Sequence, residues 1–243
     1  GYLDLTKILA GSEGTLMITT ELKLRLVDIP PSRSIMIIPH FQSIHECMLA
    51  VVTIMAHRPY TCELMDRTIL SCTDGHEVYR QYKFFVEGDP AALLVVEFRD
   101  ENTDILENKY HALVEDLKSK GLGYAFPTVD MKDHKKVWDL RKAGLGLMAN
   151  IAGDKKLIEC IEDTAVALED LPAYIAEFAE MMKGYDQKPL YYAHAGAGEI
   201  HLRPLLNMHD AADRKEFREI CEASAKLVKK YNGSLSGEHG DGR

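Results

Sequence analysis

Tyr192-Ala193-His194-Ala195-Gly196-Ala197-Gly198-Glu199-Ile200-His201 is the most informative stretch of this chain. If Ala197-Gly198 form a two-residue turn, the stretch is a β-hairpin in which residues 194 and 201 are directly opposed. Directly opposed side chains point to the same face, with Cβ atoms roughly 4.5–5.5 Å apart. We therefore expect His194 and His201 to lie close enough to bind one divalent cation.

A second glycine-rich motif, Gly237-Glu238-His239-Gly240, stands near the end of the sequence. Two histidines and one carboxylate, with one position left open, are typical of a catalytic metal site. Glu238 is therefore the candidate third ligand. His239 stands beside it and is the candidate for proton transfer. The alternative is a glycine-rich hairpin with two surface histidines and no metal.

Composition narrows the class of protein. The chain has 243 residues, 46% hydrophobic and 28% charged, as in ordinary globular proteins. Its net charge of −9 argues against a nucleic-acid partner, which needs a basic face. Five cysteines without a C-x-x-C motif are interpreted as reduced thiols, which predicts a cytoplasmic protein without its own iron–sulfur cluster. Seven histidines without a partner motif are interpreted as surface or satisfied core residues: His40, His45, His57, His76, His111, His134 and His209.

The hydrophobic pattern predicts an α+β fold of two ferredoxin-like βαββαβ units with antiparallel sheets, over about 33–127 and 155–237. Alternating Leu22, Leu24 and Leu26 predict a half-buried strand before the units, and Pro30-Pro31 a linker. The first unit is expected to begin with a strand at 35–38 and a helix capped by Ser43, to continue with a helix around 64–70, and to close with a strand at 123–126. The second is expected to close with a strand at 233–236.

The distance between the two motifs stays open. In the simple ferredoxin-like order the last strand is not adjacent to the hairpin. Glu238 would then lie on the order of 10 Å away, given a strand spacing of about 4.8 Å. Gly237 and Gly240 could instead allow the loop after that strand to turn back toward the histidines.

The motifs together resemble the C-terminal substrate domain of FAD-linked oxidases, a group that includes glycolate oxidase subunits, D-lactate dehydrogenases and D-2-hydroxyglutarate dehydrogenases. The resemblance covers nearly the whole chain, in order. It rests on five segments: Leu9-Ala10-Gly11-Ser12-Glu13-Gly14-Thr15-Leu16, Trp138-Asp139-Leu140-Arg141, Glu162-Asp163-Thr164-Ala165-Val166, His194-Ala195-Gly196-Ala197-Gly198-Glu199-Ile200-His201-Leu202-Arg203-Pro204 and Ser236-Gly237-Glu238-His239-Gly240-Asp241-Gly242.

This resemblance implies roles for individual residues. It implies that His194, His201 and Glu238 bind a divalent metal, usually zinc, that His239 is the general base, and that Arg141 binds the substrate carboxylate. The segment that it places against FAD consists of Gly11, Ser12, Glu13, Gly14 and Thr15. The implied reaction is metal-assisted alkoxide formation on a 2-hydroxy acid, followed by transfer of the α-hydrogen to flavin as hydride.

The resemblance also implies a domain plan. Residues 1–28 correspond to the end of an FAD-binding domain, and 29–243 to the substrate domain, truncated at its C-terminus. FAD would then bind only in the full-length protein, and the fragment alone is expected to be folded, colourless and inactive as a dehydrogenase. The Gly-Glu-His-Gly-Asp-Gly variant occurs in relatives fused to a downstream iron–sulfur region. An iron–sulfur domain or subunit is therefore an expected electron acceptor, and peripheral attachment to the inner face of the membrane is kept as an alternative to a purely cytoplasmic location.

Departures from the family pattern bear on the substrate. The commoner hairpin form is His-x-Gly-Asp-Gly-Asn-x-His, whereas Ala197 and Glu199 stand here. Relatives that act on hydroxyglutarate have a Thr and a Lys where this chain has Leu145 and Ile161. A second-carboxylate clamp is therefore not supported, and a monocarboxylate such as lactate or glycolate is expected.

Two other classes of function are weighed against the dehydrogenase. One is a metal-dependent hydrolase, in which His194, His201 and Glu238 bind the metal and His239 activates water. The other is a non-catalytic ferredoxin-like binding module. The flavin-type segment near the N-terminus argues against the hydrolase.

Overall fold

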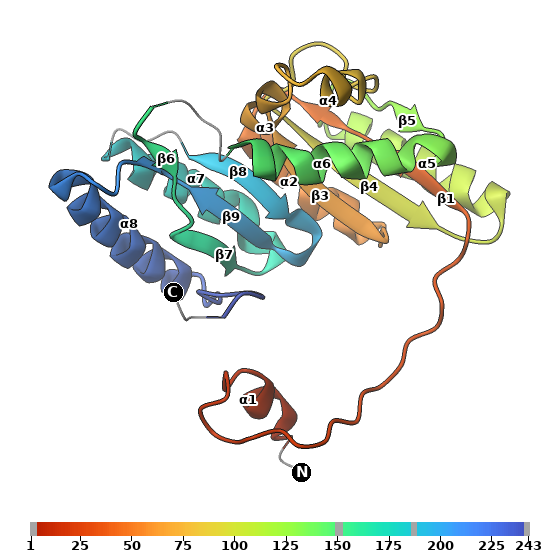
Figure 1. The fold of residues 1–243 in the computed structure, drawn as a ribbon. Helices are drawn as coiled ribbons and strands as arrows, with labels where there is room; N and C mark the ends of the chain where they lie inside the picture. The colour runs from red at the N-terminus through yellow and green to blue at the C-terminus, as the bar shows by residue number, and fades with distance from the viewer. Residues whose placement is uncertain (1–3, 149–152, 186–188, 241–243) are drawn as a thin grey trace.

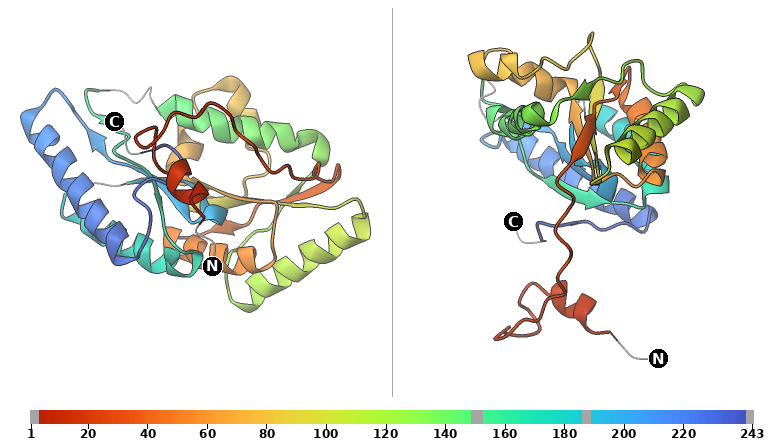
Figure 2. Two further views of the ribbon diagram at one scale, coloured as in Figure 1. Left: turned by 90° about the horizontal axis from the view of Figure 1, so that it is seen from below. Right: turned by 90° about the vertical axis from the view of Figure 1, so that its right-hand side faces the viewer.

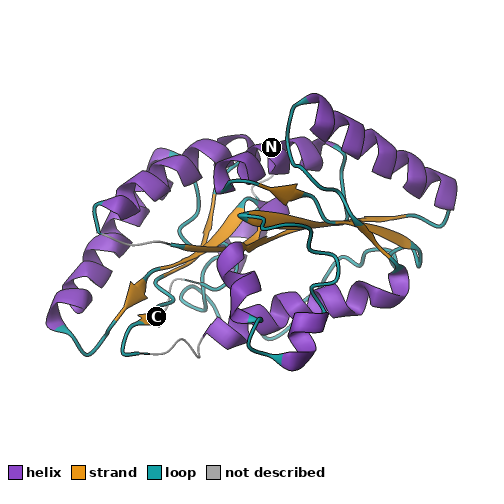
Figure 3. Ribbon diagram, turned by 90° about the horizontal axis from the view of Figure 1, so that it is seen from above, coloured by secondary structure: helices purple, strands orange, loops and turns teal. Residues whose placement is uncertain are grey.

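The computed structural model describes residues 4–148, 153–185 and 189–240. An eight-stranded sheet lies at its centre, with helices on both faces (Figures 1 and 3). Every strand pairing is antiparallel, so the predicted α+β class with antiparallel strands is confirmed. None of the helices in the described residues has the length and apolar character needed to span a membrane.

The main sheet has the strand order β5-β1-β4-β3-β8-β9-β7, and β2 also pairs with β4. Its strands are β1 (Ser34–Ile37), β2 (His40–Phe41), β3 (Thr61–Asp66), β4 (Ala92–Arg99), β5 (Thr128–Val129), β7 (Ile161–Ala165), β8 (Leu190–His194) and β9 (Glu199–Arg203). A separate two-stranded sheet pairs β6 (Lys156–Leu157) with β10 (Leu205–Leu206).

The helices alternate with these strands in two halves of the chain. They are α1 (Thr6–Ala10), α2 (Ile44–Ala56), α3 (Arg67–Cys72), α4 (Glu77–Gln81), α5 (Thr103–Ser119), α6 (His134–Met148), α7 (Leu171–Lys183) and α8 (Ala211–Lys230). Leaving out β2, β10 and the inserted α3 and α4, the first half runs β1-α2-β3-β4-α5-β5, and the second runs β7-α7-β8-β9-α8. The halves join where β3 pairs with β8, with Leu64 opposite Ala193 and Met65 opposite Tyr192.

One face of the sheet is covered along its whole width. Helices α2, α5, α7 and α8 pack there on alternate residues of the strands, and their contacts form one continuous apolar core. Ser43 caps α2 as predicted, because its side chain accepts a hydrogen bond from the backbone N–H of Glu46 at 3.1 Å. The largest fully buried side chains of this core are Tyr174, Phe41, Phe98 and Phe178.

The other face, here called the α6 face, is covered over the first half and over the neighbouring part of β8, where Leu190 and Tyr192 join the apolar core. Helices α3 and α6 pack on β1, β4 and β3 through a smaller apolar core that includes Met36, Met65 and Val95. Gly144 of α6 lies so close to α3 that a Cβ would meet the side chain of Ile69 at 2.4 Å. On the second half, the same face carries polar side chains on β8 and β9. The site described below lies there.

Asp66 connects the two halves at the end of β3. One oxygen of its buried carboxylate accepts the N–H of Ile69 at 3.0 Å and caps α3, while the other accepts the N–H of Tyr191 on β8 at 2.9 Å. Burial raises the pKa of Asp66 to about 6. The carboxyl group thus fixes a helix start and a strand pairing at once.

Several predicted elements differ in the structure. Leu22, Leu24 and Leu26 are 69%, 70% and 89% exposed and form no strand, because no partner strand in the described residues lies beside them. Figure 2 shows this N-terminal segment standing away from the layered body. The helix expected around 64–70 starts later, at Arg67, because Leu64 and Met65 are needed for pairing with β8.

Two predicted closing strands also change. The strand expected at 123–126 is shifted to β5, which pairs with β1 through Thr128 and Val129. The strand expected at 233–236 is reduced to two isolated bridges, Asp163 with Ser236 and Ala165 with Ser234. Gly233 lies against β7 so tightly that a Cβ would be 2.4 Å from the carbonyl oxygen of Ala165.

Candidate metal and substrate site

The hairpin has a different register from the one predicted. His194 lies opposite Glu199, and His201 lies opposite Tyr192, so the two histidines are diagonal rather than directly opposed. The connection is a short 3₁₀ turn at Ala195–Ala197 followed by Gly198, in place of a two-residue turn. Because the shift is by two residues, both histidines still point to the α6 face.

Gly198 explains this turn. Its φ is +72°, and a Cβ at this position would lie 2.2 Å from the carbonyl oxygen of Val166. Only glycine accommodates both the left-handed conformation and this close approach. The N–H of Val166 in turn donates to the carbonyl of Gly198 at 3.0 Å, which fixes the tip of the hairpin beside β7.

The structure brings His194, His201 and Glu238 together. One ligand atom from each of these residues, here called the ligand triad, lies within 4.8 Å of the other two. His194 Nε2 and Glu238 Oε1 are 3.5 Å apart. Ligand atoms about 2.0–2.1 Å from a tetrahedral zinc ion lie about 3.3 Å from one another, so this spacing fits such an ion. The loop after the last bridge thus turns back over the sheet.

A carboxylate that the sequence analysis missed orients His194. Glu63 on β3 accepts a hydrogen bond from His194 Nδ1, with its two oxygens at 2.9 and 3.1 Å. This bond raises the pKa of His194. It leaves the other ring nitrogen, Nε2, facing Glu238. A carboxylate on the far nitrogen of a histidine is the usual support for a metal ligand, and it fixes the ring and its tautomer.

Arg141 of α6 lies under the same group of residues. Its Nη2 donates to Glu63 at 2.5 Å and to the carbonyl of Ala193 at 3.0 Å, and its guanidinium stacks over Tyr192 at 4.1 Å. The residue is only 6% exposed. Its Nε is buried and has no hydrogen-bond partner within the described part of the chain.

His239 borders the ligand triad. Its ring lies 5.8 Å from that of His201, centre to centre, and its Nε2 is 3.4 Å from Glu238 Oε1. His201 itself is buried, whereas the side chain of His239 is 39% exposed. His239 is therefore accessible from solvent, whereas His201 is not.

Glu199 stands directly across from His194 and is 7% exposed. Burial raises the pKa of Glu199, and the nearby charge of Glu238 acts in the same direction. Its carboxyl carbon would lie 3.0 Å from a Cβ at Gly237, so the carboxyl packs directly under the loop that carries Glu238.

The expected flavin segment reaches the same region. Ala10, Gly11 and Glu13 line a cavity of about 750 Å³ together with residues 233–240, including Glu238 and His239. Ser12 and Thr15 make hydrogen bonds within the segment itself, and Gly14 has a positive φ of 77°. Two of the five expected residues therefore face the loop of Glu238 directly.

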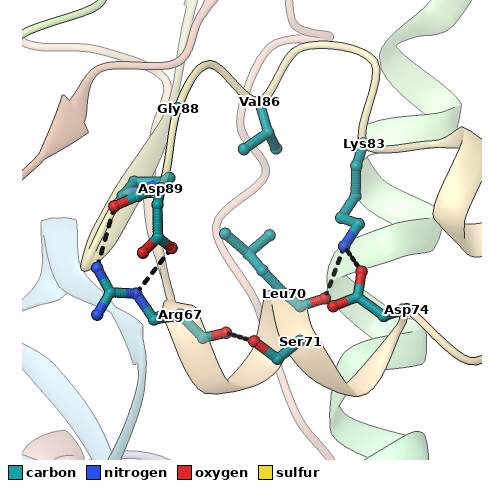
Figure 4. Close-up of a pocket in the computed structure, with 9 residues that line it drawn as sticks. Arg67, Leu70, Ser71, Asp74, Lys83, Val86, Gly88 and Asp89 are labelled. Carbon is teal, nitrogen blue, oxygen red and sulfur yellow. Dashed lines mark hydrogen bonds and ion pairs between the residues drawn. The ribbon is translucent and has the colours of Figure 1, made fainter.

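A second cavity, of about 290 Å³, lies beside α3 and away from the ligand triad (Figure 4). Its two cations are already paired: Arg67 with Asp89 at 3.0 Å, and Lys83 with Asp74. A cavity whose charges are neutralised internally is a poor site for an anion. We assign it no function.

Glu63 could not have been found from the sequence. It lies 131 residues before His194, in a strand whose pattern gives no sign of a partner. Asp163, in contrast, belongs to a segment that the resemblance had singled out, although no role was given to it. Leu145, where a substrate contact was considered, has a side chain outside the described part of the structure.

Comparison with known proteins agrees with these motifs. A family model described as FAD linked oxidases, C-terminal domain, matches residues 30–243. D-2-hydroxyglutarate dehydrogenase of Pseudomonas putida is 30% identical over 250 residues, covering 100% of this chain and 25% of the relative. The glycolate oxidase subunit GlcD of Escherichia coli is 28% identical, covering 99% and 46%. D-lactate dehydrogenase of Anaerostipes hadrus is 26% identical, covering 100% and 50%. The chain thus spans a quarter to a half of these relatives.

Solved structures show the same fold at lower identity. The 4-ethylphenol oxidase of Gulosibacter chungangensis matches with a TM-score of 0.56 at 11% identity, over 84% of this chain and 45% of that one. An alkyldihydroxyacetonephosphate synthase matches with a TM-score of 0.53 at 16% identity, over 96% and 45%. At these identities the likeness concerns the fold alone.

Proposed function

The chain belongs to the family of FAD linked oxidases, C-terminal domain, and on that premise we propose that it forms the substrate domain of an FAD-dependent 2-hydroxy-acid dehydrogenase. One observation carries this proposal: His194, His201 and Glu238 each place a possible ligand atom within 4.8 Å of the other two, with His239 beside them, on the uncovered part of the α6 face. The curated relatives named as dehydrogenases or oxidases of such acids support the same reaction class.

We propose that the ligand triad binds a divalent cation, with zinc as the best fit to two imidazoles and one carboxylate. The support of His194 by Glu63 is the observation that favours an ion there. When bound, such an ion would lower the pKa of the substrate hydroxyl. His239, close to the triad and accessible, would accept the hydroxyl proton.

Arg141 is proposed to bind the substrate carboxylate through its guanidinium, which lies over Tyr192 and beside Glu63 at the site. The neighbouring charges favour a small monoanion such as lactate or glycolate. Glu63, Glu199 and Glu238 surround the site with carboxyl groups, while Arg141 is paired with Glu63. A second substrate carboxylate would meet these groups, and among the described residues the nearby Arg141 and Arg203 are already paired with Glu63 and Glu159.

FAD is proposed to bind in the whole protein, at the side where Gly11 and Glu13 face the Glu238 loop, and to accept the α-hydrogen as hydride. Residues 1–28 would then belong to the FAD-binding domain, and 29–243 to the substrate domain. A downstream iron–sulfur region remains the proposed electron acceptor, with the protein in the cytoplasm or on the inner face of the membrane. Ser12, Gly14 and Thr15 would shape the segment rather than contact the loop.

We also propose that the two halves are ferredoxin-like repeats. In the first half the strands lie in the order β5-β1-β4-β3, and in the second in the order β8-β9-β7, followed by the bridges of the 233–236 segment. Numbered within each half, both orders read 4-1-3-2 or its reverse. That order, with a helix after the first and third strands, supports the predicted duplication.

The test is anaerobic flavin reduction in the protein with its FAD-binding domain, using D-lactate, glycolate, D-2-hydroxyglutarate and a wider panel of 2-hydroxy acids. We expect bleaching of the flavin by a monocarboxylate, and a loss of about 10²–10⁴-fold in its rate in His239→Gln. His209→Gln, at an exposed histidine outside the site, is the matched control. The dehydrogenase proposal fails if no acid bleaches the flavin, and ester hydrolysis by the chain alone would favour the hydrolase.

A further inference from the structure

Asp163 of β7 is buried beneath the second motif, with 2% of its surface exposed. A single carboxylate oxygen, Oδ2, accepts the backbone N–H groups of Glu238 and His239, both at 2.6 Å. The same oxygen accepts the hydroxyl of Ser236 at 3.1 Å. Three donors from one loop thus converge on one atom of a strand 75 residues away in the sequence.

The backbone of Asp163 completes this attachment. Its carbonyl accepts the N–H of Gly237 at 2.7 Å, so four consecutive residues of the loop are bonded to one residue of the sheet. Gly237 lies so near that a Cβ would be 3.1 Å from this carbonyl oxygen. An ionised carboxylate suits the role, because it only accepts hydrogen bonds and can accept several at once.

We propose that Asp163 is the positioning residue that holds Glu238 and His239 on the hairpin. Its role is indirect, because its oxygen binds the backbone of the loop rather than the side chains of Glu238 and His239. Without it, the loop would lose three of its four bonds to β7, and Glu238 would no longer be held near His194. This inference rests on the metal site proposed above, and it accounts for the Glu162–Val166 segment that the proposed reaction leaves without a role.

The matched comparison is with Asp66, a buried acid whose carboxylate also accepts two backbone N–H groups. Asp163→Ala and Asp66→Ala should both lower the melting temperature, because each leaves buried donors without a partner. Asp163→Ala should change the site more. We expect its zinc affinity, measured by competition with a chromogenic chelator, to fall about 10–100-fold, the usual cost of lost support around a metal. Asp66→Ala, which loosens β8 only at Tyr191, should lower the affinity less.

Two more conservative variants distinguish a change at the site from a failure to fold. Asp163→Asn keeps the volume and one acceptor oxygen but lacks the charge, so its zinc affinity should lie between wild type and Asp163→Ala. Gly237→Ala keeps Asp163 and pushes the loop outward, because its Cβ would be 3.0 Å from the carboxyl carbon of Glu199. It should also weaken zinc binding. Unchanged zinc affinity in all three variants would overturn the inference.

A second measurement does not depend on metal. Hydrogen exchange in the metal-free protein should be faster at the amides of Glu238 and His239 in Asp163→Asn than in wild type, with the amides of α8 unchanged. Equal exchange rates at these two amides would overturn the positioning role. If wild-type protein binds no zinc while these amides still lose protection, the metal proposal fails and the positioning role stands.

Discussion

On the α6 face, the first half of the sheet carries apolar side chains such as Met36 and Met65, whereas the second half carries His194, Glu199 and His201. On the opposite face both halves belong to one apolar core. The difference follows the helices. Where α3 and α6 cover the sheet, most alternate residues are apolar, and where that cover ends they are polar.

The boundary between these regions is a buried polar network. Glu63 on the first half binds both Arg141 of the covering helix and His194 of the open half. The covered region thus supplies the rigid support, and the open region supplies the reactive groups, an arrangement that favours a preorganised site. Variants in the two regions should therefore affect stability and metal binding differently.

The largest loss of stability is expected for Glu63→Ala, which affects both regions. It leaves the guanidinium of Arg141 buried without its carboxylate, which costs about 3–5 kcal/mol. The free energy of unfolding, measured by urea denaturation, should fall by this amount, and zinc affinity should fall with it. Glu63→Gln, which keeps the shape, should lose less of both. A loss below about 1 kcal/mol in Glu63→Ala would show that the network does not support the covered half.

Met36→Ala should affect the covered region alone. Met36 is fully buried on β1, away from the ligand triad, and truncation of a buried methionine costs about 2–5 kcal/mol. Urea denaturation should show this loss, whereas chelator competition should give the wild-type zinc affinity. Zinc affinity that fell together with stability would mean that the two regions are not separable.

The pH dependence of stability in Asp66→Asn tests the buried carboxyl at the junction of β3 and β8. Burial raises the pKa of Asp66 to about 6 from its ordinary 3.8, so the folded state binds the proton more tightly than the unfolded state. The resulting stabilisation is present below about pH 3.8 and is lost as the pH rises through about 6. Asparagine does not titrate, and it caps helices well.

The stability of Asp66→Asn relative to wild type should therefore improve by roughly 2 kcal/mol between about pH 4 and pH 8, at about 1.36 kcal/mol per pKa unit. Urea denaturation at intervals across this range measures the difference. Parallel stability curves for the two proteins would contradict a raised pKa at this junction.

His194→Ala should have the smallest effect on stability and a large one on zinc. Its side chain is 34% exposed, and its main bond is to Glu63, so the expected loss is about 1 kcal/mol or less. Zinc binding should be abolished, because one of three ligands is missing. His209→Ala should change neither quantity. Zinc affinity unchanged in His194→Ala would remove this residue from the ligand set.

Local patterns predicted much of this molecule correctly. The cap at Ser43 could be predicted because helix starts depend on neighbouring residues. His40 was interpreted as a surface or satisfied core residue, and the structure shows the latter: its two ring nitrogens pair with the carbonyl of Ile38 and the N–H of Glu87. The strand predicted from the alternation of Leu22–Leu26 was wrong, since alternation indicates a strand only if a partner strand is available.

The sequence alone determined the α+β class and the identity of the residues that could bind a metal, because periodicity and motif are properties of short segments. Only the tertiary structure decided the hairpin register, the support of His194 by Glu63, and the attachment of Glu238 and His239 to Asp163. These depend on the pairing of β3 with β8 and on the close approach of backbone at Gly198 and Gly237. Contacts between residues 75 to 131 positions apart are set by how whole strands and helices pack, which no local pattern specifies.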